Sequence, residues 1–182
     1  MCRVTARGFD EEYAAHAGRT YRYCLFLTNS LQEAEDLTSE VFIRLLAHRQ
    51  QVETRYVLPW LYTVARNLCL NHLRKEARRR FVGRLLGRGE PRDVGRRDEP
   101  WRDVAALEAV RTLNHRDQQV VFLRVFEDLS FSEVAAALDI SEGAAKMAFH
   151  RSMRVLRTVF DGEGPGRPER GGADLRGEHC GT

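Results

Sequence analysis

Lysine is nearly absent from this sequence of 182 residues, since only Lys75 and Lys146 occur and arginine supplies the other 27 of the 29 basic side chains. Neither lysine follows a glycine, so the phosphate-binding motif G-K-[ST] of nucleotide hydrolases cannot occur. The motifs H-E-x-x-H of zinc proteases and G-x-S-x-G of hydrolases are missing as well. We therefore predict that the protein is not an enzyme and uses no cofactor.

Cysteine is scarce and widely spaced. The four cysteines stand at positions 2, 24, 69 and 180, and none forms a C-x-x-C pair. This usage is typical of a reducing compartment in which thiols are buried or incidental, and it gives no set of four zinc ligands. The sequence thus predicts no metal site. It leaves open one alternative, an interaction or redox-sensing protein that uses the scattered thiols.

Long apolar runs are also lacking, although a hydrophobic fraction of 43% permits well-packed cores. No stretch of 18 apolar residues exists, and residues 1–7 contain no apolar run of a signal peptide. We therefore expect a cytoplasmic protein with no direct insertion into a membrane.

The charges that are present are distributed unevenly. Residues 1–73 carry eight basic and eight acidic side chains, residues 74–98 carry ten and four, and residues 99–182 carry eleven and fourteen. The net charge of +3 therefore contains a central stretch with a net charge of +6. Such a concentration indicates an anionic partner. Arginine suits phosphate oxygens and base edges, although its predominance can equally reflect genome composition.

Helical patterns fill two blocks, and a stretch rich in glycine and proline separates them. We predict an all-α fold of two small helical domains, residues 9–76 and 101–160, because no segment alternates β-branched with polar residues. Residues 77–100 are expected to form a flexible basic linker with a frayed helical start. Residues 161–182, rich in glycine, are expected to be a disordered tail.

Helix starts can be located from local signals. Ser30 followed by Glu33, and Ser130 followed by Glu133, each have the spacing of a capping box, in which two side chains satisfy free backbone donors at a helix N-terminus. Pro59 suits the first turn of a further helix.

The segment 131–157 has the layout of a helix-turn-helix, with a short corner at 139–141 and a basic second helix. The geometry of this motif sets the second helix in the major groove of DNA. We expect the second helix to bury a stripe made of Ala145, Phe149, Met153, Leu156 and Phe160. The outward residues predicted to contact DNA are Lys146, Met147, His150, Arg151 and Arg154. An ordinary helical hairpin with a solvated basic face is the alternative.

The first block carries two faces of different chemistry. A helix that starts after Ser30 has an acidic edge beside its apolar stripe, which suits a protein partner. The helix that follows Pro59 has polar and basic residues at spacings of three to four, which suits nucleic acid. The residues of this second face are Arg66, Asn67, Asn71, His72, Arg74 and Lys75.

Four segments, in this order and spacing, resemble a known family. They are AEDLTSEVF, WLYTVARNLCLNHLR, DQQVVFLRVFEDLSFSEVAAALDISEGAAK and HRSMRVLR, and they lie within residues 9–160. The chain resembles the extracytoplasmic-function sigma factors of bacterial RNA polymerase. The resemblance implies sigma region two in the first domain and sigma region four in the second. It also implies core RNA polymerase and promoter DNA as partners and, as in many relatives, an anti-sigma factor.

The resemblance assigns a contact to each predicted face. It implies that the clamp helices of the polymerase's largest subunit dock on the acidic face, which comprises Glu35, Asp36, Leu37 and Glu40. It implies that the polar face of the next helix contacts the −10 element, and that residues 50–58 and the helix from Trp60 capture an unstacked base. Core packing of Trp60 is favoured over a wedge role. The basic second helix of the helix-turn-helix is implied to recognise the −35 element.

The function expected from these inferences is that of an alternative sigma factor in a stress response. Such a factor binds core RNA polymerase, recognises −35 and −10 promoter elements and promotes DNA melting. The main alternative is a stand-alone helix-turn-helix regulator. That alternative explains residues 131–157 but leaves the two faces of the first block without a purpose.

Overall fold

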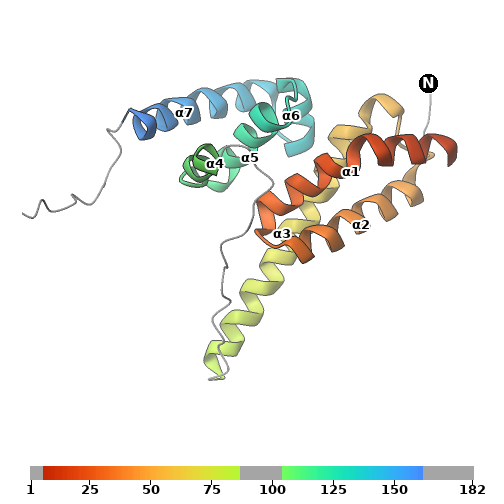
Figure 1. Ribbon diagram of the computed structural model, residues 1–182, viewed down its shortest axis with the longest axis horizontal. Helices are drawn as coiled ribbons and strands as arrows, with labels where there is room; N and C mark the ends of the chain where they lie inside the picture. Colours follow the sequence, from red (N-terminus) through yellow and green to blue (C-terminus); the bar gives the residue numbers. More distant parts are fainter. Residues whose placement is uncertain (1–5, 87–103, 162–182) are drawn as a thin grey trace, which may run out of the picture.

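The computed structural model describes residues 6–86 and 104–161, and in these two ranges all regular secondary structure is helical (Figure 1). The predicted all-α fold is therefore confirmed. The helices are α1 (Ala6–Thr28), α2 (Leu31–His48), the 3-10 helix η1 (Thr54–Tyr56), α3 (Val57–Leu85), α4 (Val104–Arg111), α5 (His115–Val121), the π-helix η2 (Phe122–Phe126), α6 (Phe131–Leu138) and α7 (Glu142–Phe160). None of the described helices is long and apolar enough to cross a membrane.

The helices α1, α2 and α3 pack against one another as a three-helix bundle. Asn29, in a left-handed conformation with φ of 52°, turns the chain between α1 and α2. The Ser30 hydroxyl then accepts a hydrogen bond from the Glu33 N–H at 3.4 Å, as the sequence predicts. The fully buried centre of the bundle consists of Tyr23, Cys24, Ala34, Val41, Leu45, Val57, Leu61, Tyr62, Ala65 and Cys69.

The helix α3 is longer than its sequence pattern indicates. Its 29 residues extend for about 43 Å at 1.5 Å per residue, and its last part projects past α1 and α2 (Figure 1). It continues to Leu85, nine residues beyond the predicted domain end at 76, so the helical start of the predicted linker is ordered helix. The rest of the predicted linker and the predicted tail from 162 lie outside the described residues.

The helices α4 to α7 form the second group, and side-chain caps determine where three of them begin. The Asn114 side chain accepts from the backbone N–H of Asp117 at the start of α5. Ser130 and Glu133 form the predicted capping box at α6, with both hydrogen bonds present. Ser141 caps α7, and Asp139 ends α6 in a left-handed conformation with φ of 54°. The predicted helix-turn-helix is therefore present.

The buried stripe of α7 differs from the predicted one. Ala145 and Leu156 are buried as expected, but Met153 is 37% exposed and Phe160 is 61% exposed. The other buried positions are occupied by small residues, Ala148 and Ser152. Small side chains let α7 approach the helices beneath it closely, while Leu156 is buried and Phe149 is partly buried against the core, and Met153 and Phe160 lie outside this contact.

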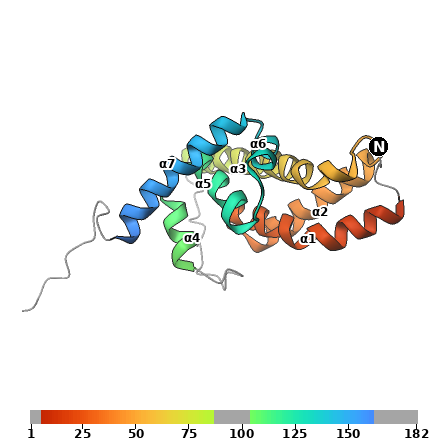
Figure 2. The ribbon, with the colours of Figure 1, turned by 90° about the horizontal axis from the view of Figure 1, so that it is seen from above.

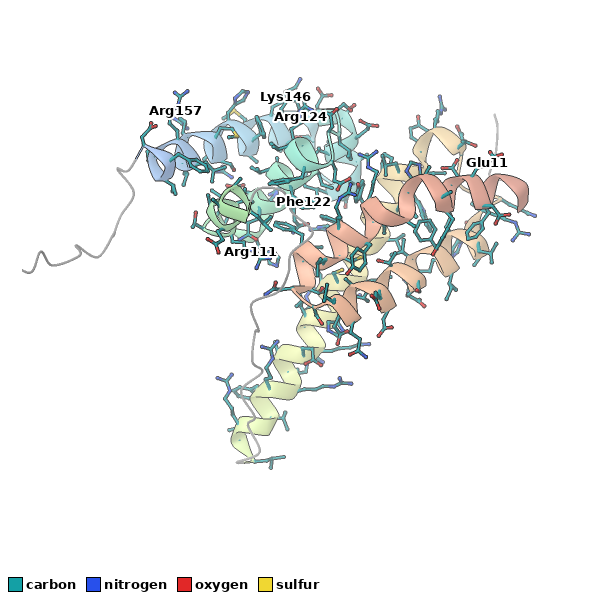
Figure 3. The ribbon with its side chains drawn as sticks, in the orientation of Figure 1. Glu11, Arg111, Phe122, Arg124, Lys146 and Arg157 are labelled. Atoms are coloured by element: carbon teal, nitrogen blue, oxygen red, sulfur yellow. The ribbon has the colours of Figure 1, made fainter. Side chains whose placement is uncertain are left out.

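The two helical groups also pack against each other, and this was not predicted. The helix α6 packs on α3, and the groups lie side by side in both ribbon views (Figures 1 and 2). Phe122, labelled in Figure 3, lies against α1, where its ring stacks on Phe26 at 4.3 Å between centroids and lies 5.7 Å from Tyr23. The two domains therefore share one continuous apolar core.

Candidate nucleic-acid and polymerase interfaces

The helix-turn-helix is fixed by packing at its corner. The Phe131 ring of α6 meets the Phe149 ring of α7 edge to face, 5.5 Å between centroids. The Ile140 N–H donates to the Ala135 carbonyl at 3.0 Å, which closes the end of α6 before α7 begins. These local contacts give α7 a defined direction relative to α6, as a recognition helix requires.

Most of the residues predicted to contact the −35 element lie on the open side of α7. Met147 is 70% exposed, and Lys146, His150 and Arg154 are exposed as well. In Figure 3, Lys146 and Arg157 both point away from the rest of the molecule. Lys146 Nζ lies 2.6 Å from the Glu142 carboxylate, but both side chains are about half exposed, so this pair contributes little stability.

Arg151 is placed differently from its neighbours. Its Nε donates to Asp117 Oδ2 at 3.0 Å and its Nη2 to Asp117 Oδ1 at 2.6 Å, a bidentate pair between α7 and α5. The Asp117 side chain is only 4% exposed, so Arg151 neutralises a buried carboxylate. Hydrogen bonding to Asp117 raises the pKa of Arg151. This residue therefore has a structural role that the sequence pattern did not indicate.

The residues predicted to contact the −10 element do not all share one surface of α3. Asn67, Asn71, Arg74 and Lys75 are exposed, and the Arg74 guanidinium donates to the side-chain amide oxygen Oδ1 of Asn71 at 3.4 Å. His72 points to the other side of the helix, where its Nε2 lies 3.2 Å from the Glu33 carboxylate of α2. The Arg66 Nε donates to Gln119 Oε1 of α5 at 3.1 Å.

A pocket of about 480 Å³ opens where α2, η1 and α3 meet. It is lined by His48, Gln51, Val52, Glu53, Tyr56 and Trp60. Trp60 is partly buried and packs against the core, as favoured, yet it also lines this pocket. The family resemblance assigned base capture to residues 50–58 and the helix from Trp60, and it singled out neither Tyr56 nor His48. The isolated tyrosine in this polar loop was the sequence signal that could have indicated Tyr56.

The predicted acidic face lies on the outer side of α2. Glu35 and Asp36 are exposed, Leu37 is half-buried, and Glu40 pairs with Arg44 at 2.9 Å. Ile43, 61% exposed, extends the same surface because it lies seven residues after Asp36. The sequence analysis did not assign Ile43 to this face. Its position outside the buried stripe of α2 was the signal that could have indicated its exposure.

The chain matches two family models and many characterised proteins. Residues 13–79 match Sigma-70 region 2 and residues 103–156 match Sigma-70, region 4. The chain is 30% identical over 156 residues to the ECF RNA polymerase sigma factor SigL of Mycobacterium tuberculosis. This alignment covers 81% of the present chain and 86% of SigL.

The chain belongs to the extracytoplasmic-function sigma factors.

A further relative belongs to the same family, and a solved structure shares the fold. The sigma factor is 35% identical over 163 residues to the ECF RNA polymerase sigma factor BldN of Streptomyces coelicolor, covering 85% of this chain but only 61% of the length of BldN. The sigma factor RpoE of Bartonella quintana, solved with the anti-sigma factor NepR, has the same fold, with a TM-score of 0.65 at 19% identity over 86% of this chain and 98% of that one.

The family membership confirms the resemblance seen in the sequence. The bundle α1 to α3 is sigma region two, and α4 to α7 form sigma region four. The protein is an alternative sigma factor for transcription initiation, and the stand-alone regulator is not favoured, since both regions match in order. Its relatives are sigma factors rather than enzymes.

Proposed function

We propose that this sigma factor docks on core RNA polymerase with the outer face of α2, contacts the −10 element with α3 and recognises the −35 element with α7. The observation that supports this division is the chemistry of the three exposed faces. The α2 face is acidic and apolar, whereas the α3 and α7 faces are basic and polar. Only the latter two suit the phosphates of DNA.

The α2 face suits a helical partner with basic residues. Asp36 and Glu35 supply charge at its edge, and Ile43 supplies apolar area that lies exposed in the free protein. Apolar area with a polar rim is typical of protein contacts. The clamp helices of the polymerase's largest subunit are the partner that the family implies.

The pocket between α2 and α3 suits a base taken out of the DNA stack. Flipping a base costs on the order of a few kcal/mol, and each stacking step lost in melting costs about 1.4 kcal/mol. Stacking of a base on an aromatic side chain returns roughly 1–3 kcal/mol. Tyr56 and Trp60 offer aromatic rings at this pocket, and Asn67 and Arg74 lie farther along α3 for neighbouring strand contacts.

The α7 face suits the major groove, but on its own it should recognise DNA only weakly. A single helix-turn-helix module buries only about 600–1,000 Å² against DNA. Two weak modules become selective together when one scaffold presents both, because the second contact then occurs at high effective concentration. Core polymerase is the scaffold in this proposal, and the cytoplasm is the compartment in which it works.

An anti-sigma partner also belongs to this proposal. The RpoE of similar fold was solved with the anti-sigma factor NepR. A protein that covers the α2 face or the α3 face would keep this sigma factor from polymerase or promoter.

The test uses two pairs of matched variants in core-binding and in vitro transcription assays. Asp36→Arg should reduce core binding at least tenfold, whereas Glu11→Arg, the same charge reversal on exposed α1, should not (Figure 3). Lys146→Ala should reduce transcription and keep core binding, with a loss of about 1–3 kcal/mol in promoter affinity where the residue reads a base. Arg157→Ala, near the far end of α7, should have a smaller effect. Unchanged core binding in Asp36→Arg, or equal losses in the two α7 variants, contradicts the proposal. A randomised promoter library then identifies the preferred sequence.

A further inference from the structure

The last turns of α3 project beyond α1 and α2, and most of their residues are exposed (Figure 1). Residues 75–86, called the α3 tip below, hold five basic side chains and one acidic side chain. Four large apolar side chains with exposed fractions between 48% and 71% lie among them, namely Phe81, Val82, Leu85 and Leu86. Single exposed apolar residues are ordinary, but a contiguous group of them marks a contact surface for a protein or a membrane.

Helical geometry gathers these apolar side chains on one side of the α3 tip. Phe81 and Leu85 are four residues apart, as are Val82 and Leu86, so each pair shares a face of the helix. Leu85 follows the buried Cys69 by 16 residues, which is about 160° around the axis at 3.6 residues per turn. The apolar side of the tip is therefore turned away from the bundle that buries Cys69.

A hollow at the α3 tip combines positive charge with apolar surface. It has a volume of about 490 Å³ and is lined by Lys75, Arg78, Arg79, Val82, Gly83 and Leu86. The Arg79 guanidinium lies 3.0 Å from the Glu76 carboxylate, but the arginine side chain is 77% exposed, so this pair is weak. Three cationic groups thus surround an apolar lining. This combination suits a ligand with an anionic head and an apolar body, which is the chemistry of an acidic phospholipid.

Other occupants fit the α3 tip less well. Double-stranded DNA offers phosphates to the cations but little apolar surface to the four hydrophobic side chains. A second copy of the chain would bring one group of cations against another, and like charges across an interface are unfavourable. A protein partner would need a groove shaped to a projecting helix. A bilayer receives such a helix without a shaped site, because basic side chains lay their stems along the apolar surface and extend their charged ends to lipid phosphates.

We propose that the α3 tip binds the surface of a bilayer that contains anionic phospholipid. The four apolar side chains enter the boundary between headgroups and acyl chains, and the basic side chains contact the lipid phosphates. The tip lies on the membrane and does not span it; of the helices in residues 6–86 and 104–161, none is long and apolar enough to do so. Because the apolar area is small, the attachment is reversible and depends on the negative charge of the lipid.

Attachment to a bilayer competes with the proposed contact between α3 and the −10 element. Leu85 follows Asn67 by 18 residues, which is about five full turns, so the two side chains lie in line along α3. A bilayer that covers Leu85 therefore faces the same side of α3 that the promoter strand would contact. Chains attached to the membrane are withheld from promoters. This consequence, unlike the attachment itself, rests on the proposed function.

The experiment compares five full-length chains, namely wild type, Leu85→Gln, Arg78→Gln, Val125→Gln and Arg157→Gln. Sedimentation measures their binding to vesicles of equal parts phosphatidylglycerol and phosphatidylcholine, and to vesicles of phosphatidylcholine alone. Val125→Gln is the apolar control, because Val125 is 54% exposed but lies in η2. Arg157→Gln removes the same charge as Arg78→Gln from an exposed position of α7. Glutamine is a good helix former, and circular dichroism checks that every variant keeps the helicity and thermal midpoint of wild type.

Wild type and both controls should bind the anionic vesicles and leave phosphatidylcholine vesicles unbound. Leu85→Gln should bind about tenfold more weakly, because burial of a leucine side chain favours association by about that factor. Arg78→Gln should bind about fivefold more weakly, because one basic group near the anionic surface is lost. A wild type that ignores the anionic vesicles would overturn the proposal and leave an acidic protein as the partner of the tip. Equal binding by each tip variant and its control would overturn it too, because attachment would then depend on overall composition.

Transcription in vitro with anionic vesicles present tests the competition. The vesicles should lower the transcript yield of wild type several-fold and that of Leu85→Gln less, each relative to the same chain without vesicles. Vesicle binding without a lowered yield would overturn the competition while upholding the attachment. A wild type that supports no transcription even without vesicles would instead contradict the proposed function.

Discussion

Replacing Tyr62 by phenylalanine removes one oxygen atom from the interface between the two sigma regions. The Tyr62 side chain is fully buried, and its hydroxyl donates to Glu127 Oε2 at 2.9 Å. Phenylalanine fills the same space, so no cavity forms, and the change isolates one hydrogen bond. We expect Tyr62→Phe to destabilise the folded chain.

The loss of stability expected for Tyr62→Phe follows from the charge of the hydrogen-bond acceptor, the Glu127 carboxylate. Hydrogen bonds to charged groups contribute about 1.5–3 kcal/mol, and the lower end applies because the Glu127 carboxylate keeps two guanidinium partners. Urea slopes for small proteins are about 1–3 kcal/mol/M. A loss of about 1.5 kcal/mol therefore lowers the urea midpoint by roughly 0.5–1.5 M.

Urea unfolding followed by far-ultraviolet circular dichroism measures this shift. The matched control is Tyr56→Phe, at a tyrosine that is 52% exposed, where a change within about 0.5 kcal/mol is expected. A double-mutant cycle with Glu127→Gln should give a coupling energy of about 0.5–3 kcal/mol between the two side chains. Equal midpoints for Tyr62→Phe and wild type, or strict additivity in the cycle, would refute the argument, because the contact would then contribute nothing in solution.

The Tyr62 phenol should also make the stability of the folded chain depend on pH. Burial raises the pKa of Tyr62 above its ordinary value of 10.0, and the negative charge of Glu127 raises it further. The folded chain thus binds this proton more tightly than the unfolded chain. The resulting stability is complete below pH 10 and is lost as the pH rises above it towards the folded pKa. Between pH 10 and 11, wild type should lose more stability than Tyr62→Phe.

Three further predictions concern single side chains. Arg151→Ala should lower the thermal midpoint of the protein in circular dichroism more than Arg151→Lys does, since Asp117 loses its guanidinium partner; an unchanged midpoint would leave Arg151 with a DNA role alone. Ser130→Ala should lower the free energy of unfolding by about 1 kcal/mol in denaturant titrations, through loss of the capping box. Cys24 and Cys69, both fully buried, should react with a thiol reagent only after unfolding; rapid labelling of either in the native chain would favour the redox-sensing alternative.

Local signals allowed much of the fold to be predicted from the sequence. The starts of α2 and α6 were found because Ser30 and Ser130 cap them through neighbours three residues away. Such contacts depend on the adjacent sequence alone. The end of α3 was misjudged because glycine and repeated arginines suggested a linker, whereas Gly83 is tolerated inside the helix. The three exposed faces were predicted for a similar reason, since helical periodicity places residues on a face without tertiary information.

Contacts between distant segments were not predictable in the same way. Glu127 looks like an ordinary surface acid in the sequence, and its partners lie more than 60 positions away. The burial of Ala148 and Ser152 was missed because small residues carry a weak hydrophobic signal. The structural role of Arg151 was hidden because exposed and ion-paired arginines share the same periodicity. In each case the deciding partner belongs to another helix.

Arg66 of α3 combines an observed contact with a proposed one. Its Nε donates to Gln119 Oε1 across the interface between the two regions, and it is also proposed to contact the −10 element. Arg66→Ala should therefore both lower the thermal midpoint, because the contact with Gln119 is lost, and weaken promoter contact. Asn67 lies about 100° farther around the helix, at 3.6 residues per turn, and is exposed. Asn67→Ala should weaken promoter contact with no change in the thermal midpoint. A lowered midpoint for Asn67→Ala, or an unchanged one for Arg66→Ala, would contradict this separation of DNA contact from interface stability at adjacent positions of one helix.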